Sequence, residues 1–302
     1  MLFDISKADT EEIQDELFIK KQVTVSVLRL DKIHPLVSGN KLFKLHYFLE
    51  EAIEGKHDTV LTFGGAYSNH LTATAYACKL LQLKSIGIVR GEKPAPLSHT
   101  LQQCLQDEMQ LKFITRLQYD EKDDAAFISE LKHEFGECVI IPEGGYHPLG
   151  AKGASLIMDL IKDNSYTHIC IPTGTATTTA GILLAANQWQ TVVSMPVLKG
   201  LTDTETRIKH LTGNDDEFSN LIILDDYHFG GYAKKTEQLI QFMNHCWQKY
   251  KLPLDFVYTA KMFFGIIDRI KNDGFEKGSK ILCLHTGGLQ GNKSLSLNPL
   301  FF

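Results

Sequence analysis

The chain alternates short apolar runs with longer stretches in which apolar residues recur every three or four positions. Unbroken Val, Ile and Leu runs are typical of strands buried on both faces, and the periodic stretches are typical of amphipathic helices. The runs predict strands at 58–63, 85–91, 111–116, 137–145, 167–174, 191–198, 220–226 and 279–288. The periodic stretches predict helices at 68–82, 97–109, 123–135, 150–162, 177–189, 204–213, 234–250 and 261–271. This alternation predicts an α/β fold with two open, mainly parallel sheets and helices on both faces.

Glycine and proline gather at residues 143–153, which is the best candidate for a domain boundary. We therefore expect two α/β lobes with a cleft between them. The smaller lobe takes residues 44–150, and the larger lobe takes residues 1–43 together with 151–302.

The composition is that of an ordinary globular protein, with 43% hydrophobic residues, 22% charged residues and a net charge of -5. No basic field is present to attract nucleic acid or an anionic membrane. No apolar stretch is long enough to span a bilayer, and the acidic opening segment argues against a signal peptide. We therefore expect a cytoplasmic protein. Its six cysteines form no CxxC pair, which predicts buried, reduced thiols.

Glycine-rich turns follow four of the predicted strands. They read GGAYSN (64–69), EGGYHPLG (143–150), PTGTATTT (172–179) and HTGGLQGN (285–292). In open parallel sheets, ligands bind beyond the carboxyl ends of the strands, so these turns are expected to converge on one cleft.

The turn at 172–179 has the features of a phosphate site. Gly174 allows the backbone to approach an anion closely, and the following helix start adds free amides. Hydroxyl groups come from Thr173, Thr175, Thr177 and Thr178. The turn lacks the lysine of a P-loop and is not G-x-G-x-x-G, so a single phosphate suits it best. An ordinary threonine-capped helix start is the alternative.

A second helix start carries Ser68, Asn69 and His70. Small polar side chains and free amides at this position suit a carboxylate or a phenolate oxygen. The alternative is simple capping of the helix by Ser68.

Lys41 and Lys44 lie one helical turn apart at the start of a predicted helix, where the helix dipole repels cations. Beside a cleft, desolvation and the dipole both lower the pKa of a lysine, and a neutral amine is what a Schiff base requires. The alternative is a pair of solvated surface cations. A reactive lysine, a phosphate turn and a carboxylate turn in one chain together describe a site for pyridoxal 5'-phosphate.

Seven segments resemble, in chain order, segments of the 1-aminocyclopropane-1-carboxylate deaminase/D-cysteine desulfhydrase family. They are SGNKLFKLHYFLEEA, FGGAYSNHLTATA, PEGGYHPLGAKG, PTGTATTTAG, DDYHFGGYAK, DFVYTAKMFFGIID and HTGGLQG. The resemblance covers nearly the whole chain and implies a tryptophan-synthase-β-like pyridoxal phosphate fold. It also implies that the larger lobe binds the cofactor and that the smaller lobe lies on the substrate side.

The resemblance implies a role for each matching position. Lys41 would form the Schiff base, Asn69 would contact the cofactor's ring hydroxyl, and Lys44 would give electrostatic support. The implied cofactor-binding residues are Lys41, Asn69, Thr173, Gly174, Thr175, Ala176, Thr177, Thr259 and Thr286. The implied substrate-binding residues are Ser68, Asn69, His70, Tyr232, Tyr258 and Lys44, and the implied catalytic residues are Lys41, Ser68 and Tyr258.

Two positions separate the branches of this family. The deaminases resemble VYEGK and HLGG, whereas this chain has Thr259 in VYTAK and Thr286 in HTGG, the desulfhydrase-like pattern. A carboxylate beside the pyridine nitrogen keeps it protonated, whereas a hydroxyl leaves it largely neutral and a weaker electron sink. A good leaving group such as thiolate needs less carbanion stabilisation than opening a cyclopropane. His70, where deaminases commonly have Gln, and the 225–234 loop depart from the pattern.

The resemblance thus implies β-elimination on a small amino-acid substrate, D-cysteine giving pyruvate, sulfide and ammonia. Deamination of 1-aminocyclopropane-1-carboxylate to 2-oxobutanoate and ammonia is the alternative activity, and a non-catalytic cofactor-binding homologue is the third possibility. The twelve histidines show no metal-ligand spacing, so no metal is expected. We expect a homodimer. The apolar run at 297–302 would be buried either at its interface or on its own domain.

Overall fold

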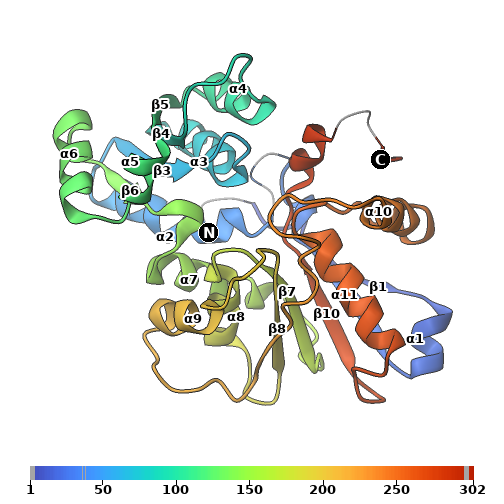
Figure 1. Ribbon diagram of the computed structural model, residues 1–302. Coiled ribbons are helices and arrows are strands. Elements are labelled where there is room, and N and C mark those ends of the chain that lie inside the picture. Colours follow the sequence, from blue (N-terminus) through green and yellow to red (C-terminus); the bar gives the residue numbers. More distant parts are fainter. Residues whose placement is uncertain (1–3, 36, 38, 296–298) are drawn as a thin grey trace.

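Two sheets form the framework of the computed structural model, which describes residues 4–35, 37, 39–295 and 299–302 (Figure 1). The larger sheet has the order β1–β2–β10–β7–β8–β9, and the smaller has the order β5–β4–β3–β6. Their strands are β1 (Thr10–Ile13), β2 (Thr24–Arg29), β3 (Thr59–Gly64), β4 (Lys84–Arg90), β5 (Gln110–Ile114), β6 (Val139–Ile141), β7 (His168–Thr173), β8 (Thr191–Pro196), β9 (Leu221–Ile223) and β10 (Lys280–His285). Among the described residues, every pairing except that of β1 with β2 is parallel, which confirms the predicted fold class.

Helices cover both faces of the larger sheet and pack against the smaller one. They are α1 (Glu16–Lys21), α2 (Lys41–Glu54), α3 (Asn69–Leu80), α4 (His99–Gln106), α5 (Arg116–Asp120), α6 (Ala125–Phe135), α7 (Pro148–Ser155), α8 (Thr177–Ala185), α9 (Thr204–Thr212), α10 (Glu237–Tyr250) and α11 (Thr259–Lys271). Short 3-10 turns occur at Leu30–Lys32, Glu143–Gly145, Met158–Leu160 and Leu289–Ser294. In Figure 1, α7, α8 and α9 lie on one side of the larger sheet, and α1, α10 and α11 lie on the other.

The alternation of side chains along β7 explains this two-sided arrangement. Ile169 and Ile171 join the apolar cluster that includes residues of α7, α8 and α9. Cys170, which lies between them, joins the cluster that includes residues of α10 and α11. Successive residues of a strand face opposite sides, so a continuous apolar run requires a cover on each face.

The predicted elements between residues 58 and 288 are present, with shorter ends in several cases. The strand predicted at 137–145 stops at Ile141, because Pro142 has no N–H for the ladder. The helix predicted at 150–162 starts earlier, with Pro148 in its first turn, and breaks into a 3-10 turn after Ser155. The pattern did not predict β1, α1, β2 or α5.

The two sheets share one apolar cluster, which bears on the expected division of the chain. The expected boundary at 43/44 falls within α2, and Phe48 of that helix belongs to the same cluster as Val60 in the smaller sheet and Ile171 in the larger. The division into one lobe of residues 44–150 and another of residues 1–43 with 151–302 stays a prediction.

All six cysteines are buried free thiols, as predicted. Of the apolar run at 297–302, residues 297 and 298 lie outside the described part. Leu300 is buried against the α10 and α11 cluster, whereas Phe301 is 64% exposed. Within the described ranges, no helix is long and apolar enough to cross a membrane.

Candidate functional site

The starts of α2, α3, α8 and α11 come together, so most of the predicted site residues lie near one another. Asn40, just before α2, donates from Nδ2 to Oγ1 of Thr178 in α8 over 2.7 Å. The Lys41 Nζ lies 5.7 Å from the ring centroid of Tyr258, which immediately precedes α11. The charges of Lys41 and Lys44 act on His70 in the first turn of α3.

Lys41 is the first residue of α2, and its amine lies against the protein interior. Its Nζ donates to Oδ1 of Asn40 over 2.8 Å. Burial lowers the pKa of Lys41 to about 8, although the negative charge of Asp255 opposes this shift. A much larger fraction of this amine is therefore neutral near pH 8 than for a solvated lysine.

Lys44 is only 5% exposed, and its Nζ donates to the Gly144 carbonyl over 3.2 Å. Burial, with the nearby charge of Lys41, holds the pKa of Lys44 well below its usual range. The alternative of two solvated surface cations is therefore wrong for this pair.

The start of α3 presents a capped helix with unused polar atoms. Ser68 caps it, accepting at Oγ from the Leu71 amide over 3.3 Å. This contact leaves the hydroxyl proton of Ser68 available. Oδ1 of Asn69 is buried and has no hydrogen-bond partner among the described residues. A buried acceptor without a hydrogen bond is energetically unfavourable, and a ligand that donates to this oxygen would remove that penalty.

The hydrogen bonds of His70 fix its tautomer. The hydroxyl of Thr62 donates to the Ile141 carbonyl over 2.7 Å, so it accepts from Nε2 of His70 at 2.9 Å. Nδ1 is then an acceptor, and it is buried with no partner among the described residues. Burial first, and then the charges of Lys44 and Lys41, lower the pKa of His70 to about 3, so the ring is neutral.

The turn before α8 is built for an anion. Ala176 has a φ of +66°, and no side chain of the described residues caps the helix, so its first amides stay free. Oγ1 of Thr175 and Oγ1 of Thr177 lie 2.9 Å apart at this end. The hydroxyl of Thr173 lies 2.7 Å from that of Ser194 and points into the interior. The alternative of an ordinary threonine-capped helix is therefore wrong.

Asp255 is a fully buried carboxylate that sequence reasoning missed. Its Oδ2 accepts from the amides of Val257 and Tyr258, each over 3.0 Å. Its Oδ1 accepts from the amide and the hydroxyl of Thr259, each over 2.8 Å. Asp255 lies six residues before the helix predicted at 261–271, and the N-cap of α11 is Tyr258, so no capping signal in the sequence pointed to Asp255. The charge of Asp255 partly offsets those of Lys41 and Lys261.

The hydroxyl of Thr259 is largely committed to Asp255. It donates to Oδ1 of Asp255 and accepts from the Asp255 amide over 2.8 Å. One lone pair remains to accept a hydrogen bond from a ligand, and the hydroxyl would have to turn its proton away from Asp255 to donate to one.

Thr286 is 5% exposed and lies where the end of β10 meets the start of α2. Gly39 has a φ of +69°, and a Cβ there would lie only 1.8 Å from the Thr286 carbonyl oxygen. Only glycine fits at this position, and the close approach fixes Lys41 relative to the end of the larger sheet.

Tyr258 stands beside Lys41, and Tyr232 packs against Tyr258. The rings of Tyr232 and Tyr258 lie 6.1 Å apart in an edge-on arrangement. Burial first, and then the charge of Tyr232, raises the pKa of Tyr258 well above its usual range. Desolvation of its hydroxyl also raises the pKa of Tyr232, although its contact with Tyr258 opposes this shift. Both hydroxyls therefore stay protonated at neutral pH.

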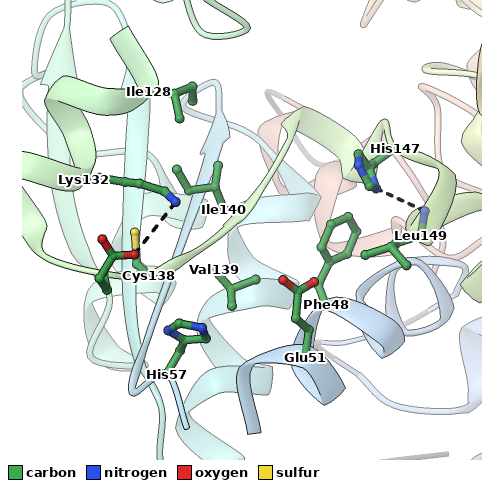
Figure 2. A pocket seen from close by; sticks show the side chains of 11 residues that line it. Phe48, Glu51, His57, Ile128, Lys132, Cys138, Val139, Ile140, His147 and Leu149 are labelled. Carbon is green, nitrogen blue, oxygen red and sulfur yellow. Dashed lines mark hydrogen bonds and ion pairs between the residues drawn. The ribbon is translucent and has the colours of Figure 1, made fainter. Parts of the chain in front are cut away.

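A separate pocket opens at the edge strand β6 of the smaller sheet, and none of the predicted site residues lines it (Figure 2). Phe48 and Glu51, from the second half of α2, form part of its wall. Lys132 forms a 4.0 Å ion pair with Glu137 at its rim. Lys41 begins α2 and is therefore more than one helical turn away along this helix.

Comparison with known proteins agrees with this geometry. Residues 18–287 match the family described as pyridoxal-phosphate dependent enzyme. The chain belongs to this family. It is therefore a pyridoxal-phosphate-dependent lyase of the 1-aminocyclopropane-1-carboxylate deaminase/D-cysteine desulfhydrase group, as the resemblance implied.

Three similar proteins illustrate the group. A Pyrococcus abyssi protein, provisionally named a 1-aminocyclopropane-1-carboxylate deaminase, is 31% identical over 89% of this chain and 86% of its own. The bifunctional D-cysteine desulfhydrase/1-aminocyclopropane-1-carboxylate deaminase of Arabidopsis thaliana is 29% identical over 84% of this chain and 70% of its own. The crystal structure of an ACC deaminase homologue has a TM-score of 0.79 and 26% identity, covering 96% of this chain and 92% of that one.

The residues of this pyridoxal-phosphate-dependent enzyme fit its cofactor. The uncapped start of α8 suits a phosphate group, and the partly neutral amine of Lys41 suits a carbonyl. The orphaned Oδ1 of Asn69 marks a place for a ligand's donor. A Cβ at Gly288 would lie 3.3 Å from both Asn69 and Asp255, so glycine keeps space open between them.

Proposed function

We propose that this enzyme removes the β-substituent of a small amino acid and that D-cysteine is its substrate, giving pyruvate, sulfide and ammonia. The observation that carries the proposal is Thr259, whose hydroxyl is held by Asp255 where the deaminase motif has a glutamate. A similar protein of Klebsiella pneumoniae, 26% identical over 92% of this chain and 88% of its own, is named D-cysteine desulfhydrase.

Pyridoxal phosphate, when bound, supplies an electron sink that stabilises negative charge at the substrate's Cα. In our proposal Lys41 holds the cofactor covalently, and the free amides at the start of α8 hold its phosphate. Asn69 contacts the edge of its ring.

The substrate's carboxylate is placed at the start of α3. The hydroxyl of Ser68 and the first amides of the helix, at Asn69 and His70, donate to it. The positive end of the helix dipole favours the anion at this point.

Lys41 is also the base. The neutral Nζ, when free, would take the proton from Cα, and Oδ1 of Asn40 would orient that amine through the 2.8 Å hydrogen bond. The Cβ–S bond then breaks, and the sulfur leaves as sulfide. The protonated hydroxyls of Tyr258 and Tyr232 supply hydrogen bonds on the side where the sulfur leaves. Overall, D-cysteine and water give pyruvate, hydrogen sulfide and ammonia.

Deamination of 1-aminocyclopropane-1-carboxylate is the second candidate function. It is favoured by the structural likeness to the ACC deaminase homologue at a TM-score of 0.79. The two activities differ in how much stabilisation the carbanion needs. The ratio of kcat/KM for D-cysteine to kcat/KM for the cyclopropane amino acid therefore distinguishes them.

The test compares kcat/KM for D-cysteine, L-cysteine and the cyclopropane amino acid in one preparation. We expect D-cysteine to be turned over and the cyclopropane substrate to be turned over poorly. Thr259→Glu combined with Thr286→Leu should move the ratio of the two kcat/KM values toward ring opening by at least about tenfold, since the ratio reports differential transition-state stabilisation.

Thr259→Gln, which adds bulk without charge, is the matched control and should leave that ratio nearly unchanged. Efficient cyclopropane opening by the unmodified enzyme would return the deaminase to first place. A protein that binds the cofactor but turns over no β-substituted amino acid would favour a non-catalytic homologue.

A further inference from the structure

Lys261 is a third lysine in the first turn of a buried helix, and no role has been assigned to it above. It lies two residues after the start of α11 and is 1% exposed. A buried ammonium at a helix start is unfavourable, because desolvation and the helix dipole both act against the charge. The charge of Asp255 opposes this effect. A cation retained at such a place needs a structural or chemical reason.

The hydrogen bonds of Lys261 lead to the loop at residues 225–235. Its Nζ donates to the His228 carbonyl over 2.9 Å and to the Gly231 carbonyl over 2.7 Å. The same two carbonyls accept from the amides of Gly231 and Lys234, over 3.0 and 3.1 Å, and so close two consecutive turns of the loop. One ammonium therefore ties together both turns.

The loop has little regular structure of its own. Phe229 and Ala233 have positive φ values of 52° and 53°, conformations that are unfavourable for residues with a side chain. At the loop's start, the hydroxyl of Tyr227 donates to Asp268 over 2.8 Å. Lys261 holds the middle of the loop, at the carbonyls of His228 and Gly231.

Tyr232 directly follows the carbonyl that Lys261 holds. Its side chain is 47% exposed, yet its ring lies 6.1 Å from that of Tyr258, which in turn lies 5.7 Å from Nζ of Lys41. An exposed aromatic side chain on an irregular loop keeps such a position only if the backbone beneath it is fixed.

We propose that Lys261 is a positioning residue, which fastens the 225–235 loop to α11 and thereby holds Tyr232 against Tyr258 at the substrate side of the site. Lys261 touches neither substrate nor cofactor and acts through Tyr232. The assignment of this side to the substrate rests on the proposed function, whereas the fastening of the loop does not.

The first experiment measures the loop without any substrate. In the cofactor-loaded enzyme, the amides of the 225–235 loop should exchange hydrogen at least about tenfold faster in Lys261→Met than in the unmodified chain. The reason is that two hydrogen bonds to a cation are lost. Tyr232→Phe should leave this exchange unchanged. Equal protection in Lys261→Met and the unmodified enzyme would overturn the fastening role. A failure to turn over D-cysteine would overturn only the proposed function.

The second experiment is a double-mutant cycle, run on whichever amino acid the enzyme turns over. Lys261→Met and Tyr232→Ala should each raise KM about tenfold with kcat changed less than about threefold, and the double variant should be no worse than either single one. Tyr227→Phe, which removes the loop's other side-chain anchor, is the matched control and should change KM less than about twofold.

Additive effects of the two changes would mean that Lys261 does not act through Tyr232. Tyr232 is exposed, so Tyr232→Ala is expected to fold even if Lys261→Met does not. An unchanged KM in Tyr232→Ala would overturn the proposal by itself.

Discussion

At the scale of single residues, the lysines show why a helix start is an informative place for a cation. Lys41, Lys44 and Lys261 each lie in the first turn of a helix, and burial lowers the pKa of all three. The dipole and desolvation act together there, which is unfavourable for stability but produces neutral amines. The sequence predicted this for Lys41 and Lys44 from position alone.

Reconstitution of the apoenzyme tests the amine of Lys41. Only the neutral amine attacks a carbonyl, so the rate constant for covalent attachment of pyridoxal phosphate should rise with pH through a midpoint of about 8. The appearance of the yellow bound cofactor in stopped-flow absorbance measures it. Lys20→Met, at an exposed lysine, should leave the profile unchanged. A midpoint near the ordinary value of 10.5 would mean that the amine is solvated before the cofactor arrives.

The identity of the reactive lysine is tested separately. Borohydride reduction of the loaded enzyme should attach the cofactor to Lys41 alone, and Lys41→Ala should bind it without a covalent link. Peptide mapping by mass spectrometry reads out the modified residue. Labelling of Lys44 instead would move the covalent link one turn along α2, and labelling of Lys261 would move it to α11.

The burial of Asp255 could not be predicted from the local sequence. Locally, Asp255 lies four residues before a helix whose N-cap is Tyr258, so its position fits no capping pattern. Its complete burial depends on packing against distant segments, including Gly288, and no local pattern carries that information. Thr259 likewise reads as a free hydroxyl in the sequence, and only the structure reveals that its proton is donated to Asp255.

At the scale of elements, the strand-to-helix turns were predictable because glycine and small polar residues mark them. The elements β1, α1 and β2 were not predicted. β1 has the sequence TEEI, is mostly exposed, and is an edge strand held by antiparallel pairing with β2. β2 pairs with β10, and Lys280 stands opposite Thr24. Such long-range partners leave no periodicity in the local sequence.

The uncapped start of α8 gives the element-scale prediction. Thr177→Asp should weaken binding of pyridoxal phosphate at least about 100-fold, because a new carboxylate would face the phosphate in a partly dry site, at a cost of several kcal/mol. Equilibrium titration of the apoenzyme measures this loss. Thr236→Asp is the matched control, since Thr236 caps the surface helix α10 and aspartate caps a helix equally well. Equal affinity in the two variants would place the phosphate elsewhere.

At the scale of the whole molecule, the site is a product of two sheets that share a core. Phe43 and Leu45 of α2 belong to the cluster that contacts both sheets, so the helix that carries Lys41 is held by both. The pattern predicted two lobes with a cleft. It did not predict this shared core, because α2 shows an apolar face in the sequence but not the partner that the face meets.

The buried amines also set the stability of the apoprotein. Lys41 and Lys261 have pKa values of about 8 in the folded chain and would have 10.5 when unfolded. Between these values the unfolded chain binds more protons at these two lysines than the folded one, so each lysine contributes a rise in the free energy of unfolding of roughly 2 kcal/mol from pH 8 to pH 10. Buried thiols and tyrosines act in the opposite direction: burial raises the pKa of Cys78 and Cys104 from 9.0 to about 12, and the pKa of Tyr258 is raised as well, so at these groups the folded chain binds more protons above about pH 9. The contribution of one lysine is therefore the difference between two pH profiles.

Urea unfolding of the apoprotein at a series of pH values measures each profile. Lys41→Met should lack the contribution of Lys41, so the unmodified apoprotein should gain roughly 2 kcal/mol relative to Lys41→Met between pH 8 and pH 10. Lys20→Met should keep the profile of the unmodified apoprotein. Identical profiles for Lys41→Met and the unmodified apoprotein would show that Lys41 is a solvated cation in the folded chain. The proposed base would then have to gain its neutral form only after the cofactor and the substrate have excluded water from the site.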